Sequence, residues 1–267
     1  MSMGRVATTI LLSMVFLIQS LSGCFGDDQE SIDYDGPIDL IVYYAVTNGT
    51  IQKSVNNGNN GPTTGVEINF DLATTTSSAG AIVTIFLDPD DGTSTIEQNV
   101  GESGAEITYE YMTHGMFEAT IGAIDDENNA HEIMVKIRID ERIEYAANNV
   151  NSENVMNFNA TNDCSDGLPQ LDRISITSEV ENPGAVFGLG GTSDVSWSLV
   201  NPDEVVVSSN TASIGDGQTE SWETTSKDAV PGDWSLIVDV EGDSVTINQV
   251  VEMRYLEGSE SPPLPRP

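Results

Sequence analysis

The histidines and the carboxylates are the side chains of this sequence that could carry out chemistry. His114 and His131 are the two histidines, and nucleophilic catalysis needs a base such as histidine beside the nucleophile. Both fall at or beside predicted turns, and no Gly-x-Ser-x-Gly elbow, phosphate-binding glycine loop or cysteine and histidine pair with zinc spacing accompanies them. Nothing singles out a pair of catalytic carboxylates among the 43 acidic residues. We therefore predict that the protein is not an enzyme.

Calcium is the one cofactor for which the sequence offers ligands. Calcium takes several oxygen ligands, and Asp88, Asp90 and Asp91 share one predicted turn. Their spacing does not match the loop of an EF-hand, and the alternative interpretation is a solvated turn in an acidic protein. The prediction is a structural calcium ion at these three aspartates or, failing that, no cofactor.

The balance of charge is the strongest feature of the composition. The sequence has 43 acidic and 9 basic residues, which give a formal net charge of −34 at pH 7. A field of this sign repels the phosphates of nucleic acids and favours cations, basic partners and solubility in concentrated salt. We therefore predict no nucleic-acid partner, and the charge indicates a saline environment.

The first 23 residues form a predicted signal peptide. Arg5 precedes an apolar run that is too short for a comfortable membrane span, and the segment ends in Leu21-Ser22-Gly23-Cys24. This ending resembles the lipobox of prokaryotic lipoproteins, which implies cleavage before Cys24 and lipidation of its thiol. We therefore expect a lipid anchor that holds the protein on the extracellular face of the cell membrane. The other cysteine, Cys164, then has an inert thiol or pairs with another molecule.

Two glycosylation sequons follow in the exported part of the chain, Asn48-Gly49-Thr50 and Asn159-Ala160-Thr161. The first lies in a polar segment, residues 48–65, that is predicted to be a loop, and the second lies in a predicted linker. Such triplets also arise by chance. They predict glycosylation at Asn48 and Asn159 if the host glycosylates exported proteins.

Short segments of alternating polar and apolar residues recur through the rest of the chain. Val66–Leu72 and Glu106–Tyr111 alternate strictly, and turn residues separate such segments at intervals typical of antiparallel β-sandwiches. The predicted fold class is all-β, with two immunoglobulin-like sandwiches in tandem. The expected organisation is a signal peptide at 1–23, an acidic spacer at 24–37, a first sandwich at 38–141, a linker at 142–167, a second sandwich at 168–257 and a disordered proline-rich tail at 258–267.

Residues 66–140 resemble a PKD domain, an immunoglobulin-like module common on microbial surfaces. Three segments carry the resemblance in order and spacing: Phe86-Leu87-Asp88-Pro89-Asp90-Asp91-Gly92-Thr93, Tyr111-Met112-Thr113-His114-Gly115-Met116-Phe117-Glu118-Ala119 and Asp125-Asp126-Glu127-Asn128-Asn129. The tryptophan and the first glycine of the family's first motif are missing here. The resemblance implies a spacer or ligand-binding module and no chemistry. With the lipobox and the acidic composition, it indicates a prokaryote from a saline habitat, specifically an archaeon.

All three tryptophans, Trp197, Trp222 and Trp234, lie in the second predicted sandwich. Core packing is one interpretation, and a cluster exposed on one sheet face would instead favour carbohydrate binding. We predict a non-catalytic, lipid-anchored cell-surface protein that acts in adhesion or ligand binding or as a spacer, with a carbohydrate or a protein as its ligand. The alternative hypothesis is an accessory subunit that docks on a secreted hydrolase or transporter.

Overall fold

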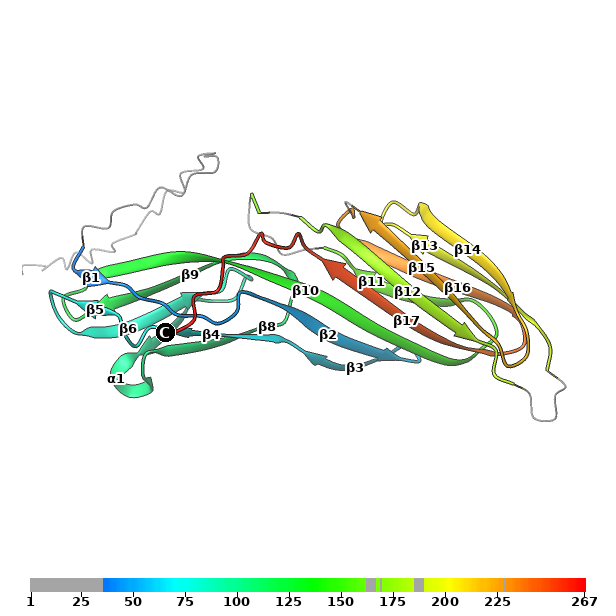
Figure 1. Cartoon of the computed structure of the whole chain (residues 1–267), viewed down its shortest axis with the longest axis horizontal. Helices are drawn as coiled ribbons and strands as arrows, with labels where there is room; N and C mark the ends of the chain where they lie inside the picture. The colour runs from blue at the N-terminus through cyan, green and yellow to red at the C-terminus, as the bar shows by residue number, and fades with distance from the viewer. Residues whose placement is uncertain (1–35, 162–166, 169, 185–189, 228) are drawn as a thin grey trace, which may run out of the picture. The chain divides into compact units, whose positions relative to one another are not determined.

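One long strand, β10 (Ala130–Val150), organises the fold (Figure 1). The computed structural model describes residues 36–161, 167–168, 170–184, 190–227 and 229–267. Side chains along a strand point alternately to its two faces. From residue 135 to residue 147, the residues of β10 at odd positions are buried, and the row that they form is Val135, Ile137, Ile139, Glu141, Ile143, Tyr145 and Ala147.

The two halves of this row belong to two hydrophobic cores. Val135, Ile137 and Ile139 pack in the first core, whereas Ile143, Tyr145 and Ala147 pack in the second. Glu141, which is 2% exposed, lies between them. One strand therefore serves both cores with the same face, and a buried charged residue marks the point where it passes from one core to the other.

The strands before β10 build the first core. They are β1 (Ile38–Asp39), β2 (Asn48–Asn56), β3 (Asn59–Thr64), β4 (Val66–Asp71), β5 (Thr76–Ser77), β6 (Ile82–Asp88), β7 (Ile96–Asn99), β8 (Glu106–Tyr111) and β9 (Gly115–Asp125). A single helical turn, α1 (Val100–Ser103), follows β7. No helix within the described ranges has both the length and the apolar character needed to cross a membrane.

The strands after β10, together with the second half of β10, enclose the second core. They are β11 (Asn154–Asn159), β12 (Arg173–Glu181), β13 (Ser193–Val200), β14 (Val206–Ile214), β15 (Thr219–Lys227), β16 (Asp233–Gly242) and β17 (Val245–Arg254). The inward positions of these strands supply the largest apolar side chains of the second core, including Trp197 and Trp234. The all-β fold class is confirmed by this arrangement of antiparallel sheets.

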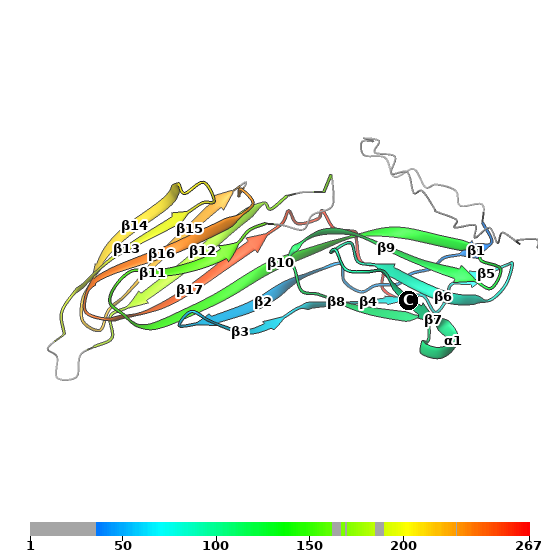
Figure 2. The ribbon, with the colours of Figure 1, turned by 180° about the vertical axis from the view of Figure 1, so that it is seen from behind.

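A mixed sheet runs through both cores in the order β15-β12-β17-β10-β9-β6-β7. β9 pairs with residues 130–139 of β10, and β17 continues along the same edge, with Glu141 opposite Met253. The other edge of β10 pairs in parallel with β2, which in turn pairs with β3. The sheets β1-β5 and β4-β8 complete the first core, and the sheet β11-β16-β13-β14 completes the second (Figure 2).

The boundary between the two cores differs from the boundary expected from the sequence. Residues 142–150, expected in a linker, are the second half of β10, and residues 154–159 form β11. The Asn-rich composition obscured an alternating pattern, since Ile143 and Tyr145 are buried while Glu144 is exposed. Residues 36–267 form one compact unit that contains both cores.

The polar segment 48–65 also differs from its prediction as a loop, because it forms the hairpin of β2 and β3. The turn is Asn57-Gly58, and both residues have positive φ angles, 48° and 75°. These angles suit a two-residue type I′ turn, for which Asn-Gly is the preferred sequence. The polar composition reflects exposure, because every residue of β3 is exposed.

The C-terminal segment, residues 258–267, was predicted to be disordered and instead lies against the first core (Figure 1). The backbones of Tyr44 and Leu264 exchange two hydrogen bonds of 2.8 and 2.9 Å. The hydroxyl of Thr47 donates to the carbonyl oxygen of Ser261 at 2.5 Å. Arg266 forms an ion pair with Asp71 at 2.9 Å. Polar contacts hold this segment in place although its sequence has little apolar content to pack.

Candidate functional site

The three aspartates predicted to bind calcium lie in the turn between β6 and β7, but their carboxylates have different partners. Asp88 accepts a hydrogen bond from the backbone of Asp90 at 3.1 Å, and Asp90 accepts one from the backbone of Glu118 at 2.8 Å. Asp91 accepts from the hydroxyl of Tyr109 at 2.5 Å. Within the described residues, no three acidic, histidine or cysteine side chains are grouped so as to hold a metal ion. These carboxylates therefore act as hydrogen-bond acceptors for the turn and for the neighbouring strands β8 and β9, and their geometry gives no support to a calcium site.

The predicted modification sites are only partly described. Cys24 and Cys164 lie outside the described residues. Asn159 is exposed at the end of β11, where its amide donates to Asp233 at 2.6 Å. Asn48 is half-buried at the start of β2, and its amide donates to Glu260 at 2.9 Å. A glycan would displace the amide hydrogen bond at either position, but Asn159 is exposed and Asn48 is half-buried, so Asn159 is the more accessible sequon.

The two histidines, predicted to lie on surface turns, have partners inside the fold. His114 is 6% exposed, with Nδ1 at 2.8 Å from the hydroxyl of Tyr255 and Nε2 at 3.4 Å from the carbonyl oxygen of Asn159. His131 is half-buried in β10, with Nδ1 at 3.1 Å from the carbonyl oxygen of Ile38. His114 therefore connects the turn before β9 to the ends of β11 and β17.

The tryptophans pack in the second core. Trp197 and Trp234 are each 1% exposed, and Trp222 is 8% exposed. Their indole groups also have internal partners, since Trp197 donates to the hydroxyl of Ser178 at 3.0 Å and Trp234 donates to the carbonyl oxygen of Val230 at 2.9 Å. The core interpretation is therefore confirmed, and none of the three can stack on a ligand at the surface.

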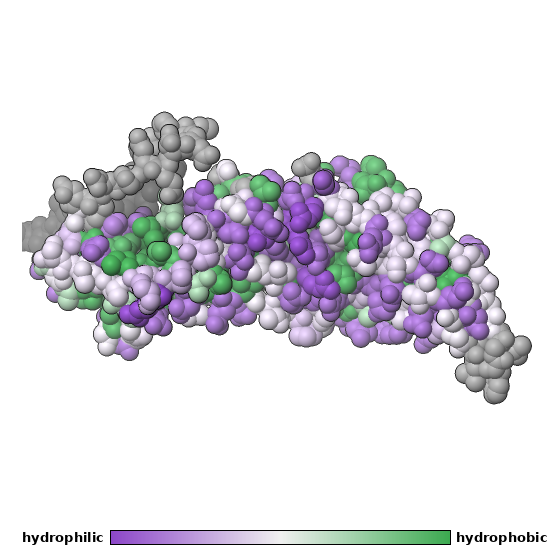
Figure 3. Space-filling view, viewed as in Figure 1, coloured by the Kyte–Doolittle hydropathy of each residue, from purple (hydrophilic) through white to green (hydrophobic). Residues whose placement is uncertain are grey.

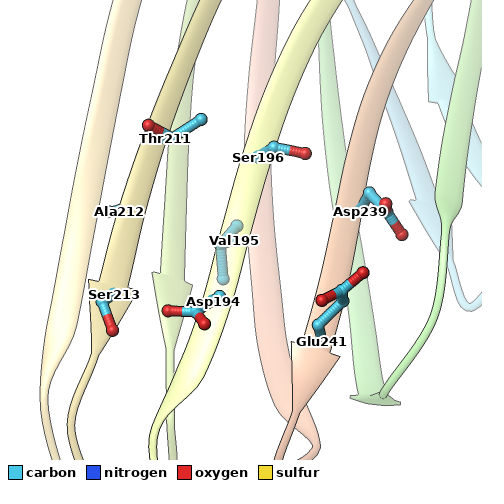
Figure 4. Close-up of a pocket in the computed structure, with 8 residues that line it drawn as sticks. All are labelled: Asp194, Val195, Ser196, Thr211, Ala212, Ser213, Asp239 and Glu241. Carbon is cyan, nitrogen blue, oxygen red and sulfur yellow. The ribbon is translucent and has the colours of Figure 1, made fainter.

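A groove of about 490 Å³ lies instead on the outer face of the sheet β11-β16-β13-β14 (Figure 4). Its polar side chains come from three adjacent strands and are Asp194, Ser196, Thr211, Ser213, Asp239 and Glu241. Strand register brings them together, because Asp194 lies opposite both Glu241 and Ser213, and Ser196 lies opposite both Asp239 and Thr211. We refer to these six residues as the sheet-face groove.

The charged side chains of the sheet-face groove are all negative. Its carboxylates, Asp194, Asp239 and Glu241, are all exposed, and no basic residue lines it. None of the ion pairs within the described part of the chain includes one of them. Like charges directly opposite on neighbouring strands repel each other. The groove is therefore suited to a ligand that brings positive charge from outside the protein.

A second polar site lies where β10 passes between the two cores. Two cavities of about 310 and 260 Å³ share Lys53, Glu141 and Asn159 as lining residues, and His114 lines the smaller one. The buried carboxylate of Glu141 forms an ion pair of 2.8 Å with Lys53 of β2. A buried charge without a partner is costly, so this pair stabilises the contact between β2 and β10 at the junction.

Replacing Lys53 with methionine is expected to lower the free energy of unfolding by roughly 1–3 kcal/mol, because the carboxylate of Glu141 then stays buried without its cation. The double variant Lys53→Met/Glu141→Leu should recover most of this loss, since an apolar side chain continues the row between Ile139 and Ile143. Urea unfolding of both variants measures the two effects. A double variant no more stable than the single one would show that Glu141 acts at the junction in some other way.

No protein-family model matches the sequence, and no curated protein matches it significantly. Solved structures that match the chain include carbohydrate-binding modules of the β-sandwich superfamily, at 13% identity and a TM-score of 0.30, over 82% of this chain and 98% of the other. They also include the CBM51-2 and INT domains of Clostridium perfringens ZmpB in complex with GlcNAc, at 10% identity and a TM-score of 0.25, over 82% of this chain and 49% of the other. A third is dimeric latent PorU from Porphyromonas gingivalis, at 11% identity and a TM-score of 0.30, over 85% of this chain and 22% of the other. These matches, whose TM-scores are 0.30 or lower, assign no ligand or activity to this chain.

The sheet-face groove was not predicted from the sequence, although two signals for it are present. Asp194-Val195-Ser196 and Asp239-Val240-Glu241 each place polar residues at the outward positions of a strand whose inward residue is buried. What the sequence lacks is the order of the strands, which brings β13 and β16 side by side. The carboxylates become one site only once that pairing is known.

Proposed function

We propose that this protein is a non-catalytic, lipid-anchored cell-surface protein that binds a basic segment of a partner protein in the sheet-face groove. The observation that carries the proposal is the set of three exposed carboxylates that share the groove without a basic neighbour. The net charge of −34 adds a long-range field that attracts positively charged partners. Such attraction raises association rates and weakens as salt screens it.

The expected affinity for a short basic probe is modest. An exposed ion pair contributes about 0.2–1 kcal/mol, so three pairs contribute roughly 0.6–3 kcal/mol. Tight adhesion would then depend on many copies acting together at the membrane, where effective concentration raises avidity. An accessory subunit that docks on a larger secreted complex could use the same groove, and it would co-purify with that complex.

Neutralising the groove tests the proposal. The variant Asp194→Asn/Asp239→Asn/Glu241→Gln should bind a fluorescent tetralysine peptide about tenfold more weakly than wild type in anisotropy titrations at low ionic strength. The matched control is Glu102→Gln/Glu106→Gln/Glu110→Gln. It changes the net charge by the same amount at exposed positions of α1 and β8, away from the groove. The control should bind nearly as well as wild type. Equal weakening of both variants would mean that the peptide senses only net charge.

A neutral carbohydrate is a second candidate ligand, because the groove also offers the hydroxyls of Ser196, Thr211 and Ser213 beside its carboxylates. Hydroxyl groups of a glycan could donate to the carboxylates and accept from these side chains. Salt dependence separates the two ligand classes. Binding of a basic segment weakens steeply with added NaCl, whereas binding of a neutral oligosaccharide changes little.

The lipid anchor rests on the sequence of the leader, Leu21-Ser22-Gly23-Cys24. Intact mass spectrometry of the host membrane fraction should find a mature protein that begins at Cys24 and carries lipid, and Cys24→Ser should release the protein into the medium. Two lipid chains give stable attachment where one chain does not. An unmodified membrane-fraction product would remove the anchor from the proposal while leaving the groove untouched.

The first core fits a role as spacer in this proposal. Its resemblance to a PKD domain and the acidic composition are consistent with a surface protein of a prokaryote, and specifically an archaeon, from a saline habitat. Good folding of the protein without added salt would count against the halophilic part of this hypothesis.

A further inference from the structure

Strand β14 is an open edge of the sheet that carries the groove. Within the described part of the chain, its backbone pairs only with β13. Its sequence, Val-Val-Ser-Ser-Asn-Thr-Ala-Ser-Ile, has nine residues without charge or proline. Six of the nine are exposed, and neighbouring Val205 is 53% exposed as well. The hydroxyl of Thr224 on β15 donates to that of Ser208, which is a side-chain contact, and no strand among the described residues pairs with the outer backbone edge of β14.

An uncharged edge of this length is unusual for this molecule. Proteins protect edge strands with charges, proline or short length, because a free edge pairs with other chains. Three other outer strands follow this rule: β15 carries Glu220, Glu223 and Lys227, β7 has four residues and contains Glu97, and β3 contains Pro62. The uncharged β11 faces the cavity shared with the β2–β3 hairpin. Figure 3 shows small hydrophobic patches on a largely hydrophilic surface.

We propose that β14 pairs antiparallel with β14 of a second copy of this chain, about a two-fold axis at Asn210. This register is self-complementary. It sets Val206 opposite Ile214, Ser208 opposite Ala212 and Ser209 opposite Thr211, which are matched pairs, and it leaves Val207 opposite Ser213 as the one pair of unlike residues. A two-fold interface uses the same patch on both subunits, as this pairing does.

The lack of charged residues in β14 makes this edge suitable for contact between two acidic copies of the chain. Two chains of net charge −34 repel each other, and β14 itself contains no carboxylate, although the register brings Glu204 and Asp216, which flank the strand, toward each other. The nearest groove carboxylate, Asp194, lies on the next strand, opposite Ser213. In the dimer the two Asp194 side chains are separated by at least three strand spacings, about 14 Å, which exceeds the Debye length of about 10 Å at 0.1 M salt. Added salt screens the repulsion between the two negatively charged chains, so it should strengthen the dimer. Its effect on a basic ligand is the reverse.

The pairing would join two four-stranded sheets into one of eight strands, with both grooves opening on the same side. It does not rest on the proposed ligand, since the dimer forms through β14 whether or not the groove binds a basic segment. If both proposals hold, one partner carrying two basic segments could engage both grooves and gain avidity.

Cysteine cross-linking tests the register directly. The chain from residue 24 onward, with serine in place of Cys24 and Cys164, contains the compact unit 36–267. In this background Asn210→Cys should form a disulfide-linked dimer rapidly under mild oxidation, because antiparallel partners bring the two Cα atoms within disulfide range. The matched control, Thr225→Cys, lies exposed on the charged edge strand β15 and should cross-link only slowly. Equal rates would overturn the proposal.

Sedimentation equilibrium supplies a second readout that does not depend on cysteine chemistry. The chain should form a dimer, and its dissociation constant should decrease when the NaCl concentration is raised from about 0.1 M to about 1 M. Ser209→Glu/Thr211→Glu places like charges opposite each other and should weaken the dimer at least about tenfold. The control Thr219→Glu/Ser221→Glu adds the same charge on β15 and should not. A protein that stays monomeric at both salt concentrations would overturn the proposal and would leave the edge to a different partner.

Discussion

Replacing Arg138 with methionine is expected to lower the free energy of unfolding by about 3–5 kcal/mol. Arg138 is 9% exposed at the junction of the two cores, where it forms ion pairs with Asp140 and, at 3.1 Å, with Glu260. Asp140 also accepts a hydrogen bond from the backbone of Tyr255 at 3.0 Å. The cluster thus ties β10 to the end of β17 and to the C-terminal segment. Without the guanidinium, two largely buried carboxylates would lack their cation.

The loss should be smaller at acid pH. Burial raises the pKa of Asp140 above its usual value, although the backbone N–H of Tyr255 and the charge of Arg138 oppose this rise. A carboxyl with a raised folded-state pKa contributes stability that is lost as pH rises, because the folded protein must then hold the charged form. Without Arg138 this effect grows. Urea unfolding of Arg138→Met at about pH 7 and about pH 4 should therefore show the larger deficit at pH 7.

Arg173 provides the matched control for this prediction. Its guanidinium pairs with Asp172 at 2.7 Å, but about a third of each side chain is exposed. Exposed pairs contribute about 0–1 kcal/mol, so Arg173→Met should unfold close to wild type. Similar losses from the two variants would show that the cluster around Arg138 has no special weight at the junction.

Replacing Trp197 with alanine is also expected to cost about 3–5 kcal/mol, because it opens a large cavity in the second core. Trp197 is 1% exposed, and its indole donates to the hydroxyl of Ser178, which is 0% exposed and would lose this partner. Thermal and urea unfolding measure the effect. Trp197→Phe keeps most of the packing and should lose clearly less stability.

The same variant separates the two interpretations of the tryptophans. A core residue should change stability and leave binding of a ligand to the folded protein unchanged. If Trp197→Ala kept its stability but lost affinity for an oligosaccharide, the core assignment would be contradicted.

Alternating sequence predicted most strands of this fold with good boundaries. Glu106–Tyr111 was predicted and forms β8, and Val66–Leu72 was predicted and contains β4. Both segments place polar residues outward against a buried face, which is the signal that a strand half-buried in a sandwich leaves in its sequence. The turn Asn57-Gly58 carried an equally clear hairpin signal, which the polar composition around it masked.

The junction between the cores could not be predicted from local pattern. β10 has 21 residues, several times the usual strand length, and its buried row is interrupted by Glu141. A charged residue at that position indicates the end of a strand when the sequence is considered alone. Its partner Lys53 lies 88 residues earlier in the chain, so only the tertiary fold explains its burial.

The C-terminal segment was hidden for a similar reason. Pro262, Pro263 and Pro265 exclude a regular strand, and the apolar content is low. Individual residues of the segment contact partners that are far away in the sequence, such as Glu260 with Arg138 and Leu264 with Tyr44. The sheet-face groove likewise depends on which strands become neighbours, a property that composition and periodicity do not encode.

Mapping the binding site of the tetralysine peptide by NMR is the most direct test of the proposed function. Addition of the peptide to the isotope-labelled protein should shift the backbone amide signals of residues 194–196, 211–213 and 239–241, which line the sheet-face groove on three adjacent strands. Amides of the acidic turn at Asp88–Asp91 should shift little. Shifts confined to those three segments would support the groove as the ligand site. Shifts spread over the acidic surface, or centred on that turn, would contradict it.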